Sequence, residues 1–115
     1  MATTLHKQVL IHARALIGDP AHWTRGTLAR DADERSVAWH DDLAIKWCAV
    51  GAIYRAAYQF TGSPELGEQI GNEVIKRLRR PRLLFACLGR GLPSINDIRG
   101  HRAVLAEFDK ALGSV

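Results

Sequence analysis

The sequence predicts a mainly α-helical fold, with four to five helices packed around a central apolar helix at about residues 42–60 and a short β-ribbon or ordered loop at about residues 24–39. Two observations carry this prediction. Apolar residues recur every three or four positions in several segments, which is the spacing of one helix face. Signals that end one helix and begin the next, above all Gly62-Ser63-Pro64-Glu65, separate these segments. With 115 residues, of which 47% are hydrophobic and 24% charged, we expect one soluble domain over residues 1–115.

The first predicted helix begins at Thr3 or Thr4, either of which can cap it, and ends at Gly18-Asp19-Pro20. Its apolar face consists of Leu5, Val9, Ala13 and Leu16 or Ile17. Two short segments that can extend follow at residues 27–30 and 36–39. The Asp-rich stretch between them is typical of a turn, so these segments predict the ribbon or ordered loop.

The central helix is predicted from the most apolar stretch of the chain, residues 43–60, with Asp41 or Asp42 as its N-cap. No residue between Trp47 and Tyr54 is charged. A helix that is apolar on nearly every face is typical of the buried centre of a bundle, and the Ala and Gly residues in this stretch would let neighbouring helices approach closely.

A third helix is predicted to follow Ser63, with Pro64 in its first position and Pro81 limiting its length. Its apolar positions are Leu66, Ile70, Val74 and Leu78. Residues 83–88 form an apolar run that fits either a short buried helix or a strand. Beyond a polar loop at residues 94–100, a final amphipathic helix is predicted from Val104, Leu105, Phe108 and Leu112.

Several classes of protein are excluded by composition and spacing. No apolar run is long enough to cross a membrane, and the N-terminus lacks the pattern of a signal peptide, so we expect a cytoplasmic protein without a membrane partner. Cys48 and Cys87 lie in apolar segments, as reduced core thiols do. The five histidines have no ligand-like spacing, and no cofactor-binding loop is present, so we expect no metal and no cofactor.

Positive charge gathers in the C-terminal part of the chain. Residues 71–115 carry nine Lys or Arg against four Asp or Glu, whereas residues 1–70 carry seven against eight. The densest cluster is Lys76, Arg77, Arg79, Arg80 and Arg82. Such a patch can bind phosphate groups or an acidic partner, which makes a nucleic-acid-binding accessory protein one alternative function. The same residues also suit a solvated helix end, where cations complement the helix dipole.

An enzyme is the weaker alternative. A Cys/His hydrolase would use Cys48 as nucleophile and His101 as base, with Asn96 or Asp97 orienting the histidine. A cysteine on an apolar helix more often serves as a small hydrophobic residue, and Cys48 is expected in the second turn of its helix. We therefore expect no catalytic residue.

Four sequence segments resemble a bacterial and phage family of domains of unknown function. They are Trp23-Thr24-Arg25-Gly26-Thr27-Leu28-Ala29-Arg30-Asp31, Trp47-Cys48-Ala49-Val50-Gly51-Ala52, Asn96-Asp97 and the closing helix at residues 104–111. The family pattern for these segments reads WxxGxxARD, WCxxGA, WND and VLxxFDxA. Ile95 departs from it where a tryptophan would precede Asn-Asp, and Glu34-Arg35 replaces a glycine-containing turn. The resemblance implies no activity, cofactor or ligand.

The polar residues of these segments suggest a binding function. We expect a groove for a ligand or a partner protein, formed by Trp23, Arg25, Arg30, Asn96, Asp97 and His101, because recognition residues gather in loops between helices. In a purely structural alternative, an Arg30–Asp97 pair ties the ribbon to the last helix. The sequence therefore favours a non-catalytic binding or protein-interaction module, compatible with self-association of such a small domain.

Overall fold

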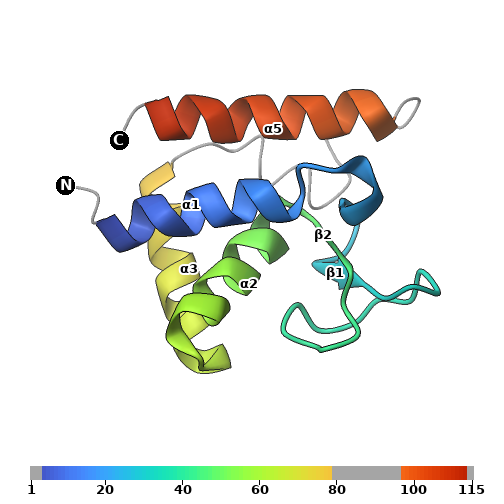
Figure 1. Cartoon of the computed structure of the whole chain (residues 1–115), viewed down its shortest axis with the longest axis horizontal. Coiled ribbons are helices and arrows are strands. Elements are labelled where there is room, and N and C mark those ends of the chain that lie inside the picture. The colour runs from blue at the N-terminus through green and yellow to red at the C-terminus, as the bar shows by residue number, and fades with distance from the viewer. Residues whose placement is uncertain (1–3, 79–96, 114–115) are drawn as a thin grey trace.

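The structure is a computed structural model that describes residues 4–78 and 97–113. Within these residues the structure has four α-helices, with a small two-stranded antiparallel sheet at one side of them (Figure 1). The elements are α1 (Thr4–Leu16), the 3-10 helix η1 (Pro20–His22), β1 (Ala29–Arg30), β2 (Lys46–Trp47), α2 (Ala49–Thr61), α3 (Pro64–Leu78) and α5 (Asp97–Gly113). The mainly helical fold is thus confirmed. Across the described part of the chain, no helix has the length and apolar character that a membrane span requires.

Helix α1 lies antiparallel to α5 and contacts α2, as Figure 1 shows. Val9, Ala13 and Ile17 are fully buried, as the helical spacing predicted. The chain leaves α1 at Gly18 and enters η1, where the Asp19 carboxylate accepts the Ala21 backbone N–H. The predicted end at Gly18-Asp19-Pro20 therefore holds, and it directs the chain into the loop that carries Trp23.

Helix α2 begins later than predicted, at Ala49 instead of about residue 42. The residues before it pair with β1 in the register Ala29↔Trp47 and Arg30↔Lys46. The backbone N–H groups of Ile45 and Cys48 donate to the carbonyls of Arg30 and Leu28, so these donors are not available to an earlier helical turn. Because sheet pairing outweighs local helix propensity here, the helix is shorter than its apolar pattern suggests.

Cys48, expected in the second turn, is instead the N-cap of α2, and its Sγ accepts the Gly51 N–H at 3.3 Å. Asp41, one of the two predicted caps, serves a separate turn in which its carboxylate accepts the Leu43 N–H. The cap prediction for this helix was therefore wrong, although the apolar residues of α2 do form the centre of the core.

The ribbon prediction located one strand correctly and missed the other. Ala29–Arg30 is a strand, but its ladder partner is Lys46–Trp47, and the predicted partner segment at 36–39 contributes only an isolated Arg30↔Ser36 bridge. An ordered turn connects Ala29–Arg30 to the segment at 36–39. In it the Asp31 carboxylate accepts the backbone N–H groups of residues 33 and 35.

Helices α2 and α3 form the most extensive helix pair of the structure. Gly62 ends α2 in the left-handed conformation, and the Ser63 hydroxyl accepts the Leu66 N–H at the start of α3, as predicted. The close approach comes from α3, where an added Cβ at Gly67 would lie 2.8 Å from Tyr58 Cα. Leu66, predicted on the apolar face, is exposed.

Helix α5 begins at Asp97, three residues into the segment expected to be a polar loop. Val104 and Phe108 are buried, α5 contacts α1, and Arg14 binds Asp109 through two hydrogen bonds. The run at 83–88 lies outside the described residues.

Candidate functional site

A polar pocket of about 380 Å³ lies beside the two-stranded sheet. We call it the ribbon pocket. Its lining comes from η1, the loop after it, β1, the following turn and β2, and comprises Pro20, Trp23, Thr24, Arg25, Arg30, Glu34 and Lys46. Segments far apart in the sequence therefore meet at this pocket because β1 pairs with β2.

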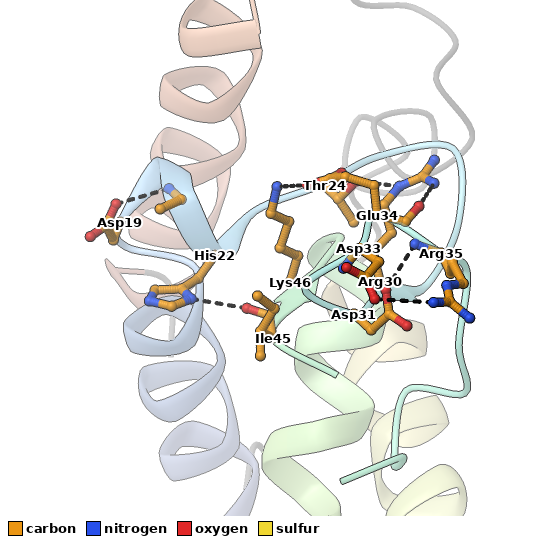
Figure 2. Close-up of polar contacts among 11 residues, drawn as sticks. Asp19, His22, Thr24, Arg30, Asp31, Asp33, Glu34, Arg35, Ile45 and Lys46 are labelled. Atoms are coloured by element: carbon orange, nitrogen blue, oxygen red, sulfur yellow. Dashed lines mark hydrogen bonds and ion pairs between the residues drawn. The ribbon is translucent and has the colours of Figure 1, made fainter. Parts of the chain in front are cut away.

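The loop that carries Trp23 and Thr24 is held against β2 by backbone hydrogen bonds. The Thr24 N–H donates to the Trp47 carbonyl at 3.1 Å, and Trp23 forms an isolated bridge with Trp47. His22 adds a side-chain bond from Nδ1 to the Ile45 carbonyl at 2.9 Å (Figure 2). The backbone position of Trp23 is thus set by the sheet.

Trp23 is only 7% exposed, yet its indole Nε1 has no hydrogen-bond partner among the described residues. Most buried N–H groups in folded proteins are paired, because an unpaired one costs about 1–3 kcal/mol. Trp23 lines the pocket with its ring, while the Nε1 atom is itself covered, so this unpaired donor reports on the packing around the pocket.

Arg30 is held by two hydrogen bonds. Its Nε donates to the Thr24 hydroxyl and its Nη1 to the Glu34 carbonyl, both at 2.9 Å. The Nη2 group has no hydrogen bond to a described residue, and it lies near Gly26, whose φ of +85° favours glycine. The guanidinium is therefore fixed in direction and keeps one amino group available.

Glu34 connects the turn to β2. Its φ is 65°, a left-handed conformation that is uncommon for a residue other than glycine. Its N–H donates to the Asp31 carbonyl at 3.0 Å, and its carboxylate forms an ion pair with Lys46 (Figure 2). The same residue thus offers its carbonyl to Arg30 and its carboxylate to Lys46, so the turn brings an acceptor to two cations.

Three of the six predicted groove residues, Trp23, Arg25 and Arg30, line the ribbon pocket. His101 lies behind it in α5, only 3% exposed, with its ring centroid 5.6 Å from that of Trp23. Its Nε2 donates to the Ile17 carbonyl at 2.5 Å, so His101 supports the tryptophan from the core.

Asn96 and the side chain of Asp97 lie outside the described part of the chain, as does the predicted Arg30–Asp97 pair. The contacts of Arg30 that the structure describes go to Thr24 and Glu34.

Four lining residues were missed by the sequence reasoning: Pro20, Thr24, Glu34 and Lys46. Thr24 lies within the segment that carries Trp23 and Arg25, so its neighbours could have indicated it. Lys46 was assigned to a helix that begins only at Ala49, and Glu34 was assigned to the Asp-rich turn without a role in a site. Both errors come from a strand pairing that no local signal reveals.

The residues of the hydrolase alternative are both buried. Cys48 is 1% exposed and its sulfur accepts a backbone N–H at the start of α2, while His101 donates to Ile17. A thiol covered in this way lacks the access to substrate that a nucleophile requires.

The predicted basic patch is described only in part. Lys76 and Arg77 are exposed in the last turn of α3, while Arg79, Arg80 and Arg82 lie outside the described residues. Within residues 4–78 and 97–113 no group of three or more His, Cys, Asp or Glu is arranged to hold a metal ion.

A second pocket of about 360 Å³ lies between α1 and the end of α2. It contains no Asp, Glu, Lys or Arg among its lining residues, which are Gln8, Ile11, His12, Ala15 and Phe60. None of the predicted site residues belongs to it. Of these two pockets, the ribbon pocket is the one with charged side chains among its described lining residues.

Comparison with known proteins gives a family and no activity. Neither a curated protein nor a solved structure matches the chain. The sequence model of one family, described as a family of unknown function (DUF6197), matches residues 1–113, in agreement with the resemblance drawn from the sequence segments. Because that match spans nearly the whole chain, the protein belongs to the DUF6197 family.

Proposed function

We propose that this protein is a non-catalytic binding module that takes a small ligand in the ribbon pocket. One observation carries the proposal: Trp23, Arg25 and Arg30, which the sequence suggested as recognition residues, line one pocket of about 380 Å³. Ligand-binding pockets commonly have volumes of about 300–1,000 Å³, with a few polar groups that orient the ligand. The size of the ribbon pocket lies in this range, and its lining is more polar than that of most such pockets, with Thr24, Arg25, Arg30, Glu34 and Lys46 among its seven residues.

The chemistry of the lining supports binding more than catalysis. The described lining residues include no Ser, Cys or His, and the groups that could act as nucleophile or base are engaged, Glu34 with Lys46 in an ion pair and Thr24 with Arg30. The Thr24 hydroxyl accepts a hydrogen bond from Arg30, which fixes the guanidinium. Groups held in this way orient a ligand through hydrogen bonds and charge.

The cytoplasm remains the compartment we propose, supported by Cys48, which is a buried free thiol. Free thiols persist where the environment is reducing.

The proposal is tested by titrating the full chain with a fragment set of mixed charge and recording ¹H–¹⁵N NMR spectra. Binding in the ribbon pocket shifts the Trp23 indole N–H and the backbone signals of its lining residues. The Trp39 indole is the internal control, because Trp39 is equally buried but packs on Tyr54 and Tyr58 away from the pocket. The proposal fails if no fragment shifts the Trp23 signal more than that of Trp39.

A pair of variants tests the location. Arg25→Ala removes a lining side chain and is expected to weaken fragment binding at least fivefold. Arg35→Ala removes the same charge from an exposed residue that pairs with Asp33 and does not line the pocket, so binding should be unchanged. Equal effects of the two substitutions would place the binding elsewhere.

A further inference from the structure

We propose that the ligand of the ribbon pocket carries an anionic group, a carboxylate or a phosphate, which replaces the Glu34 carboxylate at Lys46. This inference rests on the binding function proposed above and adds the chemical class of the ligand and the way in which it enters.

The lining of the pocket is rich in hydrogen-bond donors. Arg25, Arg30 and Lys46 contribute three positive charges, and Trp23 adds a buried indole N–H without a described partner. Glu34 is the one carboxylate among the lining residues that the structure describes. These four charged side chains give the lining a net charge of +2, which attracts a ligand with negatively charged oxygens and repels a cationic one.

The ion pair between Lys46 and Glu34 is asymmetric in its exposure. The Lys46 side chain is 24% exposed and the Glu34 side chain 58%. Glu34 can therefore turn into solvent without burying its charge, while Lys46 stays in the wall of the pocket. Losing the carboxylate would leave the partly buried ammonium without a counter-ion, unless another anion takes its place.

The backbone of Glu34 is held independently of its side chain. The Glu34 N–H donates to Asp31 and its carbonyl accepts from Arg30, so the turn persists when the carboxylate leaves Lys46. The left-handed φ of 65° at Glu34 is an unusual local conformation of the kind that concentrates at ligand-binding sites. Glu34 thus acts as an internal anion that occupies the cations when no ligand is bound.

Carboxylate and phosphate share the feature that the pocket recognises, which is a group of negatively charged oxygens. The Arg30 guanidinium, with Nη2 available and its plane fixed by Thr24 and Glu34, suits either group. The experiment therefore includes one probe of each kind.

The test uses benzoate, benzamide and benzamidine, which have nearly the same shape and carry negative, zero and positive charge, together with inorganic phosphate. Each is titrated into the full chain at constant ionic strength, with the Trp23 indole N–H as the NMR reporter. We expect saturable binding of benzoate, phosphate or both, and binding of benzamide and benzamidine at least tenfold weaker. The tighter of the two anions identifies the preferred group.

The other outcomes separate the two proposals. If benzamide or benzamidine binds as well as the anions, the anionic class is overturned while the binding function stands. If no probe moves the Trp23 signal, and the fragment set described above also fails, both proposals are overturned. If fragments bind in the pocket and both anions do not, only the present inference fails.

Replacement of Glu34 by the ligand is tested with Glu34→Gln, which removes the competing charge and keeps the size of the side chain. A partly exposed ion pair is worth about 0.2–1 kcal/mol, so anion affinity should rise about 1.4- to fivefold. Asp33→Asn is the matched control, because it removes the same charge from an exposed neighbour that pairs with Arg35. Weaker binding by Glu34→Gln, or an equal gain in both variants, would overturn the replacement of Glu34.

Discussion

The contact between the start of α2 and the strand that carries Arg30 depends on Gly51. A Cβ atom added at Gly51 would lie 2.0 Å from the Leu28 carbonyl oxygen and 2.9 Å from its carbonyl carbon. Both atoms belong to the backbone, so a side-chain rotation cannot relieve the overlap. The same oxygen accepts the Cys48 N–H at 3.2 Å, at the residue that caps α2. We therefore expect Gly51→Ala to be strongly destabilising.

The size of the effect follows from three contributions. Overpacking in a core costs about 1–3 kcal/mol, and a rigid backbone contact belongs at the upper end of that range. Weakening the hydrogen bond from Cys48 to Leu28 adds about 1 kcal/mol, and the better helix propensity of alanine returns about 1 kcal/mol. The free energy of unfolding should fall by about 3 kcal/mol in total. For a domain of this size that corresponds to a decrease in Tm of about 12 °C or more.

Urea denaturation and thermal unfolding of the variant measure this change. Gly113→Ala is the control, since nothing lies within 4 Å of a Cβ at the last residue of α5, and its stability should stay within about 0.5 kcal/mol of the parent. Because Leu28 directly precedes β1, Gly51→Ala should also weaken ligand binding in the ribbon pocket. A stability for Gly51→Ala within about 0.5 kcal/mol of the parent would refute the close approach of α2 to Leu28.

Two further predictions concern helix caps. Cys48→Ser keeps a side-chain acceptor for the Gly51 N–H, whereas Cys48→Ala removes it. Urea denaturation should therefore show that the alanine variant is less stable than the serine variant by about 1 kcal/mol. The reverse order of stability would exclude a capping role for Cys48. The pKa of Glu65 lies below its ordinary value of 4.5. The larger cause is the hydrogen bond that the carboxylate accepts from its own backbone N–H, and the second is the hydrogen bond that it accepts from the Ser63 hydroxyl. Glu65 therefore contributes to stability above pH 4.5, and this contribution is lost as the pH falls through the lowered pKa. Ser63→Ala should raise the pKa of Glu65 in an NMR titration of its carboxyl carbon, and an unchanged pKa would contradict the Ser63 contact.

The helices with strong local signals were predicted well. Gly18-Asp19-Pro20 ends α1, and Ser63-Pro64 begins α3, because capping and proline geometry act within a few residues of the chain. The start of α2 was predicted too early, since residues 43–47 continue into the apolar stretch of the helix and only the pairing of Lys46–Trp47 with Ala29–Arg30 makes them a strand.

The residues of the candidate site also divide into those with a local signal in the sequence and those that only the strand pairing brings together. Trp23, Arg25 and Arg30 could be chosen from the sequence because they are recognition-type residues in one short loop segment. Glu34 and Lys46 could not, because the ion pair between them forms only when the turn and β2 meet. His101 was chosen for its chemistry, but burial assigns it to the support of Trp23.

The sequence by itself determined that the protein is mainly helical, where α1 and α3 begin or end, and which polar residues are available for recognition. Those properties depend on hydrophobic periodicity and on capping, which act over one or two helical turns. Only the tertiary structure decided which donors share a pocket and which carboxylate opposes them. The pairing of β1 with β2 and the contact of Gly51 with Leu28 join segments distant in the chain, and hydrogen bonds between such segments leave no periodic pattern in the sequence.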